Sequence, residues 1–218
     1  MITSPLLTQF PEIMHRFGDK NDEAPLEPLV SMHQVHGVHL HSVQDSKSQE
    51  VEGCDALLSS CRDVSLAVKT ADCVPLLFFD PVKKTVAAVH AGWRGTVKGM
   101  ANKTVQMMKQ KGSLPADIRV AIGPCIRDCC FEVHHDVANP LQKQMLRWRE
   151  VLIPHATDKK KWILDLQECN RLQLTEEGII PEHIDVIPLC TSCRDDLFHS
   201  VRRDGDKAGR MMSFIRLL

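Results

Sequence analysis

The stretch VPLLFFDPVKKTVAAVH, residues 74–90, decides the fold that the sequence predicts. Two runs rich in β-branched and aromatic residues, 74–80 and 85–90, flank a short polar connection with Pro81 at a turn position. A connection this short joins two strands only as an antiparallel hairpin. We therefore expect these two runs to pair side by side in one sheet.

The rest of the chain mixes strands with helices around this hairpin. The segments 64–70 and 118–123 read as further buried strands. Helical patterns cover 96–111, which Gly112 follows, and about 166–177. This mixture predicts an α+β fold, or mixed α/β, over a purely parallel sheet, in one domain that spans residues 1–218.

The hairpin brings a thiol close to an imidazole. If Asp80 faces Lys83 across the turn, Cys73 lies opposite His90, where Cβ atoms are about 4.5–5.5 Å apart. Zinc binds thiolate at about 2.3 Å and imidazole at about 2.0 Å, so such neighbours can share one ion. A register slip of one residue would put the pair on opposite faces. Taken singly, Cys73 is as readily a small buried hydrophobic residue, and His90 is as readily the end of a strand.

A third ligand is needed, and the stretch SMHQVHGVHLH, residues 31–41, is the best donor. Its four histidines are His33, His36, His39 and His41. Their spacing does not select one of them, and such a cluster is also compatible with a polar strand or loop. Three protein ligands leave one coordination position open, which is typical of a catalytic rather than a structural metal site.

Five other cysteines fall into two groups that compete for a metal. Cys190 and Cys193 have the spacing of a zinc or redox pair, while Cys125, Cys129 and Cys130 follow a strand. No second Cys-x-x-Cys completes a four-thiolate site, so the sequence disfavours a structural zinc there. A thioredoxin-like role is weaker still, because the pair does not open a helix after a first strand.

The composition excludes several classes of partner. Lys plus Arg number 27 and Asp plus Glu 28, so no charge excess predicts binding to nucleic acid or to a membrane surface. No apolar run approaches the ~20 residues of a membrane helix, and the N-terminus does not resemble a secretory signal. Nine cysteines without a disulfide framework predict a cytoplasmic chain with reduced thiols.

Several motifs together resemble the laccase-domain purine nucleoside phosphorylase family, also described as multicopper polyphenol oxidase-like proteins and peptidoglycan editing factors. The segments that carry the resemblance are HQVHG (33–37), KTADCVPLLFFDP (69–81), VAAVHAGWRGT (86–96), AIGPCIRDCCFEV (121–133), LDLQECNRLQL (164–174) and CTSCRDDLFHSVRRDGDKAGRMMSFI (190–215). They run in order from about residue 30 to the C-terminus.

The resemblance implies a four-layer α/β/β/α sandwich and a zinc ion bound by His36, Cys73 and His90. It implies phosphorolysis of adenosine, inosine, guanosine and methylthioadenosine, and deamination of adenosine, by a monomer or homodimer. The chain departs from the family ahead of residue 33, where the Gly-Gly-Val-Ser and Ser-Leu-Asn-Leu type patterns are missing. That departure affects the substrate pocket rather than the metal ligands.

The residues after His90 suggest where phosphate could bind. Gly92 and Gly95 permit a tight turn that directs Arg94 toward the metal, and a helix beginning near Thr96 would present free N–H groups to an anion. Arg94 and Thr96 are therefore the predicted phosphate site, with Arg94 beside Cys73 and His90 as the catalytic group. A surface arginine in a turn is the alternative.

Other groups could assist either reaction. Asp72 is a candidate to protonate the leaving base, although neighbouring strand residues point to opposite faces. Arg202 and Arg203 could bind an anion or lie in a solvated turn. For deamination, the metal would activate a water for attack at the purine C6.

Two further functions remain open from the sequence. A polyphenol oxidase would use Cu²⁺, which a thiolate and two imidazoles can also bind, but it would need several copper sites. A zinc-containing protein that edits cell-wall precursors is the second alternative. It predicts that loss of zinc unfolds the chain.

Overall fold

The predicted hairpin forms the centre of the larger sheet in the computed structural model, which describes residues 2–218. Strands β7 (Val74–Asp80) and β8 (Thr85–Ala91) pair antiparallel, and every residue of both is buried. They belong to a six-stranded sheet in the order β13-β9-β7-β8-β5-β3. Its other strands are β3 (Leu40–Val43), β5 (Ala56–Ser59), β9 (Arg119–Ile122) and β13 (Ile184–Val186).

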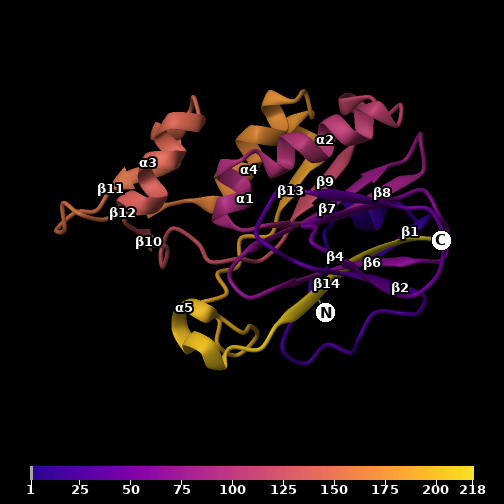
Figure 1. The fold of residues 1–218 in the computed structure, drawn as a ribbon, viewed down its shortest axis with the longest axis horizontal. Helices are drawn as coiled ribbons and strands as arrows, with labels where there is room; N and C mark the ends of the chain where they lie inside the picture. The colour runs from indigo at the N-terminus through magenta and orange to yellow at the C-terminus, as the bar shows by residue number, and fades with distance from the viewer. Residues whose placement is uncertain (1) are drawn as a thin grey trace.

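A five-stranded sheet packs against one face of the six-stranded sheet (Figure 1). Its order is β1-β14-β6-β2-β4, with β1 (Ile13–Arg16), β2 (Leu29–His33), β4 (Gln49–Glu52), β6 (Ser65–Thr70) and β14 (Met211–Leu217). Alternate hairpin residues such as Leu77 and Phe79 lie in one apolar cluster with Leu66, Val68 and Ile215 of this second sheet. This alternation places the core between the sheets.

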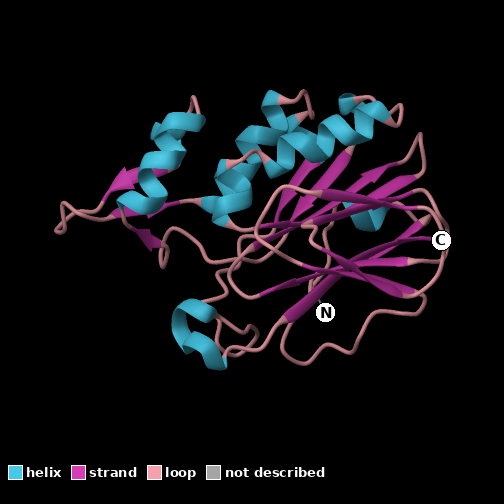
Figure 2. Ribbon diagram, in the orientation of Figure 1, coloured by secondary structure: helices cyan, strands magenta, loops and turns pink. Residues whose placement is uncertain are grey.

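Helices cover the opposite face of the six-stranded sheet, as Figure 2 shows. The alternate set of hairpin residues, including Leu76 and Phe78, packs with Met100, Val105 and Leu172 of these helices. The helices are α1 (Trp93–Val97), α2 (Met100–Gln110) and α4 (Leu166–Glu176). The hairpin is therefore buried on both faces, which explains its uninterrupted apolar character.

The expected single helix over 96–111 is two helices. Gly99 adopts a φ of 76°, in the left-handed region, and separates α1 from α2. The first helix also begins at Trp93, three residues before the predicted start at Thr96. The left-handed residue cannot continue a right-handed helix, so the chain changes direction there.

The α+β class is confirmed, but the fourth layer of the expected α/β/β/α sandwich is not found within residues 2–218. The outer face of the five-stranded sheet is crossed by the loop between β1 and β2 (Figure 2). The backbone of this loop accepts hydrogen bonds at Leu26 from Ser65 Oγ and at Leu26 and Glu27 from Arg216. Pro25 and Pro28 lack the N–H groups that a helix needs there.

Smaller elements complete the described chain. A three-stranded sheet, β10 (Glu132–Val133), β12 (Trp162–Leu164) and β11 (Leu152–Pro154), lies with α3 (His135–Gln144) at one end of the molecule, and α5 (Val201–Asp204) precedes β14. Short 3-10 turns lie at Leu7–Gln9, Pro115–Asp117, Trp148–Glu150, Pro181–His183 and Gly205–Lys207. No helix within residues 2–218 has the length and apolarity to cross a membrane.

The hairpin register differs from the expected one by two residues. Asp80 pairs with Thr85, not Lys83, so Pro75 rather than Cys73 lies opposite His90. The turn is longer than expected because Asp80 Oδ1 accepts hydrogen bonds from the N–H groups of Val82 and Lys83, at 2.8 and 2.9 Å. A shift of two preserves the face, so Cys73 and His90 remain neighbours along the same side of the ladder.

The Asp80 cap makes a testable contribution to stability. Asp80→Ala removes the acceptor of two backbone N–H groups at a fully buried position, and we expect it to lower the free energy of unfolding by about 2 kcal/mol. Asp80→Asn keeps one oxygen acceptor and should cost less. Urea unfolding of each variant measures both values.

Asp45→Ala is the matched control, because Asp45 makes a similar but exposed contact of 3.4 Å to the Lys47 N–H. We expect it to change the free energy of unfolding by no more than about 0.5 kcal/mol. Equal losses for Asp80→Ala and Asp45→Ala would contradict a special role for the hairpin cap.

Candidate metal centre

Three side chains from separate elements converge at one edge of the six-stranded sheet. His36 lies in the loop after β2, Cys73 immediately precedes β7, and His90 is the penultimate residue of β8. Their ligand atoms all lie within 4.8 Å of one another. The rings of His36 and His90 meet edge to face, with centroids 4.8 Å apart. One ion could contact all three.

A buried carboxylate that the sequence analysis missed organises this group. Asp55 has no exposed surface and lies just before β5, in register with His90 of β8. Its Oδ1 accepts from His90 Nδ1 at 2.8 Å and from the His36 N–H at 2.9 Å, and its Oδ2 accepts from the Gly37 N–H at 2.7 Å. Because Asp55 holds a proton on Nδ1 of His90, Nε2 is the ring nitrogen left to bind a metal, and it does so on losing its own proton.

The backbone is shaped to fit these ligands together. His36 has a φ of 55° and Asp72, next to Cys73, a φ of 81°, so both ligand-bearing loops pass through the left-handed region. A Cβ on Gly92 would lie 3.0 Å from both Cys73 Sγ and His36 Nδ1. Only glycine therefore leaves the room that the ligands occupy. Gln34 secures the same loop by exchanging hydrogen bonds of 2.8 Å with the backbone of Lys69 in β6.

The electrostatics of the group favour a thiolate. Burial raises the pKa of Cys73, but hydrogen bonds and charge from His36 and His90 more than offset it and lower the pKa to about 6. Burial lowers the pKa of His90, whereas Asp55 and Cys73 raise it to about 9. The pKa of Asp55 is raised by burial and lowered by its hydrogen bonds with His90 and Gly37, with a net decrease. Cys73 is thus ready to act as a metal ligand at neutral pH.

The donor set fits a metal of the zinc type. A thiolate and two imidazoles are common zinc ligands, and three protein ligands leave a fourth position open for a substrate or water. The Asp55–His90 contact supplies the carboxylate partner that metal-bound histidines usually have.

The ligands open into a cavity of about 500 Å³. Trp93, Ile126, Phe131 and Leu166 give it apolar and aromatic walls. The cations that line it are Lys69, Arg202 and Arg210. A flat aromatic molecule with an anionic group would find both apolar and cationic contacts here.

The residues predicted to bind phosphate lie outside this lining. Arg94 is exposed and its guanidinium stacks over the Trp93 ring at 4.4 Å. Thr96 is fully buried, and its hydroxyl accepts from Asn170 Nδ2 at 3.1 Å. The structure therefore groups His36, Cys73 and His90, but it does not bring Arg94 and Thr96 to them.

The other candidate groups take different places. Asp72 lines the cavity, but its two carboxylate oxygens accept from Thr191 Oγ1 at 2.6 Å and from the Arg202 N–H at 2.7 Å. Arg203 is occupied by backbone oxygens of Thr191, Ser192 and Phe198 and by Asp204. Of the two arginines, Arg202 reaches the cavity wall.

Comparison with known proteins identifies the family. A family model described as multi-copper polyphenol oxidoreductase laccase matches residues 15–218. The purine nucleoside phosphorylase YlmD of Geobacillus stearothermophilus is 40% identical over 205 residues, which span 88% of this chain and 73% of that protein. A protein named adenosine deaminase, from an unknown prokaryotic organism, is 32% identical over 198 residues, spanning 87% of this chain and 75% of that protein.

Solved structures agree with the sequence matches. The crystal structure of the Bacillus licheniformis hypothetical protein YfiH superimposes with a TM-score of 0.89 at 32% identity, covering 97% of this chain and 94% of that one. The match of the family model, the relatives and the fold confirms the resemblance seen in the motifs. The chain belongs to the laccase-domain purine nucleoside phosphorylase family, whose family model carries the polyphenol oxidoreductase description.

Proposed function

We propose that the chain is a zinc-dependent purine nucleoside phosphorylase, acting on adenosine, inosine, guanosine and methylthioadenosine, that also deaminates adenosine. The observation that carries the proposal is the opening of the His36–Cys73–His90 group into a cavity with aromatic walls and three lining cations. Relatives named for both activities support it.

The cavity offers separate contacts for the two parts of a nucleoside reaction. Trp93 and Phe131 offer apolar surface for a purine, whereas Lys69, Arg202 and Arg210 offer positive charge for phosphate. Bound zinc would supply a Lewis acid beside the reacting atoms. Asp55 holds His90 in one tautomer and Gly92 leaves the ligands their space.

Lys69, Arg202 and Arg210 fit the phosphate role by position, since Arg94 and Thr96 do not line the cavity. Two bonds from the Arg202 side chain, to the backbone oxygens of Cys130 and Glu132, hold its guanidinium in the wall. Arg210 is exposed, and among residues 2–218 its side chain bonds only backbone oxygens of Ala208 and Gly209 in its own loop. Arg210 is therefore the cation best able to turn toward an incoming anion.

Copper-dependent polyphenol oxidation is the second candidate, favoured by the family description and by a donor set that copper also accepts. A multicopper enzyme needs several copper sites. Within residues 2–218, the one other group of side chains close enough to share a metal consists of four cysteines and no histidine. The ligand arrangement thus favours a single catalytic metal.

Removing the carboxylate of Asp55 tests the metal site without changing a ligand. In Asp55→Asn, an amide NH₂ replaces one oxygen and faces N–H groups that need an acceptor. We expect zinc affinity to fall by about 10- to 100-fold, measured by competition with a chromophoric chelator. Asp45→Asn, at an exposed carboxylate, is the control. Unchanged affinity in Asp55→Asn would remove Asp55 from the site.

The low pKa of Cys73 predicts a thiolate in the zinc-free protein at neutral pH. At pH 7.5, the wild type should absorb more ultraviolet light than Cys73→Ser, by an amount that corresponds to about one thiolate per chain. The difference should disappear as the pH falls through about 6, because protonation removes the thiolate. Cys54→Ser should show no difference at pH 7.5, since burial raises the pKa of Cys54 to about 11. A midpoint near 9 for Cys73 would contradict this.

Product analysis tests the proposed activity. Zinc-loaded protein is incubated with inosine or adenosine, with and without phosphate, and the products are identified by mass. We expect phosphate-dependent release of free purine and ribose-1-phosphate, lost by at least about 100-fold in Cys73→Ala and His90→Ala. Inosine formed from adenosine without phosphate would establish the deaminase activity. No turnover by folded, zinc-bound protein would refute the nucleoside proposal.

Kinetics then distinguish the phosphate contacts. We expect Arg210→Ala to raise the KM for phosphate by about 10-fold, because one charge-assisted contact is lost. Arg94→Ala tests the site expected from the sequence. Arg149→Ala is the matched control, since Arg149 also stacks on a tryptophan at 4.4 Å and is not among the residues that line the cavity. A larger effect in Arg94→Ala than in Arg210→Ala would restore the assignment to Arg94.

A further inference from the structure

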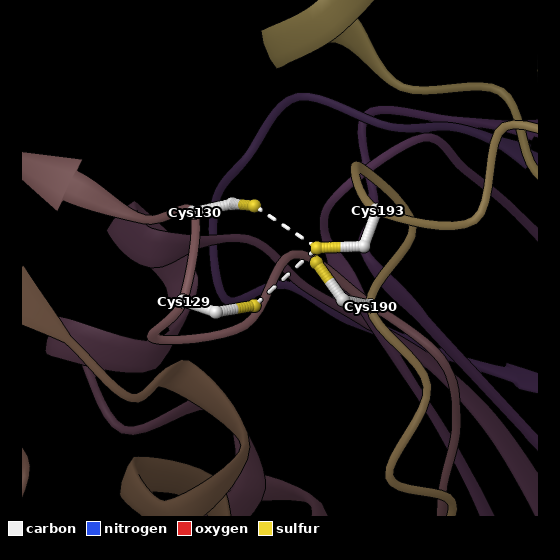
Figure 3. A group of neighbouring side chains, drawn as sticks. All are labelled: Cys129, Cys130, Cys190 and Cys193. Atoms are coloured by element: carbon white, nitrogen blue, oxygen red, sulfur yellow. Dashed lines mark hydrogen bonds between the residues drawn. The ribbon is translucent and has the colours of Figure 1, made fainter.

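Four cysteines outside the proposed active site form a second group. Cys129 and Cys130 lie between β9 and β10, and Cys190 and Cys193 lie between β13 and α5. All four sulfurs lie within 4.8 Å of one another. Cys193 Sγ is 3.3 Å from Cys130 Sγ and 3.6 Å from Cys129 Sγ, and Figure 3 shows the four side chains pointing into one space from two loops.

The sheet explains how two distant segments meet. Strands β9 and β13 pair in parallel, and the pairing continues beyond them as a bridge between Cys125 and Cys190. The Thr191 N–H donates to the Cys125 carbonyl at 2.9 Å. The loops that leave these neighbouring strands therefore run side by side. The sequence disfavours a four-thiolate site because it has no second Cys-x-x-Cys. In the structure, the adjacent pair Cys129 and Cys130 supplies the two missing thiols.

The separations of the sulfurs fit one metal ion. Four thiolates at about 2.3 Å from a tetrahedral zinc lie about 3.8 Å apart. A disulfide would need about 2.05 Å and would leave two of the four sulfurs unused. A cluster of two irons would divide the sulfurs into two separated pairs, whereas here every sulfur is close to the other three.

We propose that Cys129, Cys130, Cys190 and Cys193 bind a single structural zinc ion, distinct from the metal at His36, Cys73 and His90. Four protein thiolates close the coordination shell and leave no position for a substrate, which is the structural pattern. The site lies near the surface, because Cys129 and Cys193 are exposed while Cys190 is buried. Zinc from solution can therefore reach it.

This zinc would fix one wall of the cavity. Cys130 precedes Phe131, which lines the cavity, and the Cys130 carbonyl accepts from the Arg202 side chain at 2.9 Å. Thr191, between the two cysteines of the other loop, donates to Asp72 at 2.6 Å. The ion would thus hold the loops that carry Phe131, Arg202 and Asp72 against each other.

Zinc content of the full-length chain tests the proposal. Protein kept reduced, loaded with zinc and desalted is analysed by mass spectrometry for metal per chain. We expect Cys129→Ser/Cys193→Ser to hold about one zinc ion fewer than the wild type. Cys61→Ser, at a cysteine of neither group, should match the wild type. Equal zinc in the wild type and the double variant, or iron in place of zinc after expression, would overturn the proposal.

A second measurement does not depend on that variant folding. Cys73→Ser/His90→Ala keeps all four cysteines of the cluster but removes two ligands of the proposed active site. Loaded with Co²⁺, it should show the intense charge-transfer absorption of a tetrahedral tetrathiolate site. Absence of that absorption would overturn the cysteine site. If the absorption is present in this variant but the zinc-loaded wild type does not catalyse phosphorolysis, only the proposed function is refuted.

Discussion

The carboxylate of Asp55 is the constraint on which the site depends. A fully buried negative charge is costly unless hydrogen bonds and opposite charge compensate it. Here the compensation comes from His90 Nδ1 and from the N–H groups of His36 and Gly37. One carboxylate therefore holds the ring of His90 and the backbone of His36, which are two of the three candidate ligand residues.

The sheets place this carboxylate where it can act. The hairpin β7–β8 is buried between the second sheet and the helices, so its ends are fixed in position. Cys73, His90 and Asp55 all come from strand ends at one edge of that sheet, while His36 arrives from the other sheet through a loop that Gln34 secures to β6. The candidate metal site thus lies where the two sheets meet, beside the cavity.

Much of this arrangement could be predicted from residues alone, and the misses have physical causes. Apolar runs and turn chemistry predicted the hairpin and placed Cys73 and His90 on one face. They did not predict the longer turn, which Asp80 caps. Gly99 broke the expected helix because its backbone is left-handed. Spacing could not choose His36 among four histidines, and only the resemblance selected it.

Other features were hidden because they depend on long-range pairing. Asp55 has no motif of its own and gains its role from the β5–β8 register. In the second group, Cys193 is 63 and 64 residues from Cys130 and Cys129, so the convergence of the two loops follows from the parallel pairing of β9 and β13. Local pattern favours Arg94 and Thr96 as phosphate ligands, whereas packing directs Arg94 to solvent and buries Thr96.

X-ray absorption at the zinc edge tests the central claim most directly. It would be measured on the zinc-loaded Cys129→Ser/Cys193→Ser protein, in which the cysteine group no longer contributes four thiolates. The account predicts a zinc shell with one sulfur at about 2.3 Å and nitrogen neighbours at about 2.0 Å. A shell without sulfur, or one with several sulfurs, would contradict the site built by His36, Cys73 and His90.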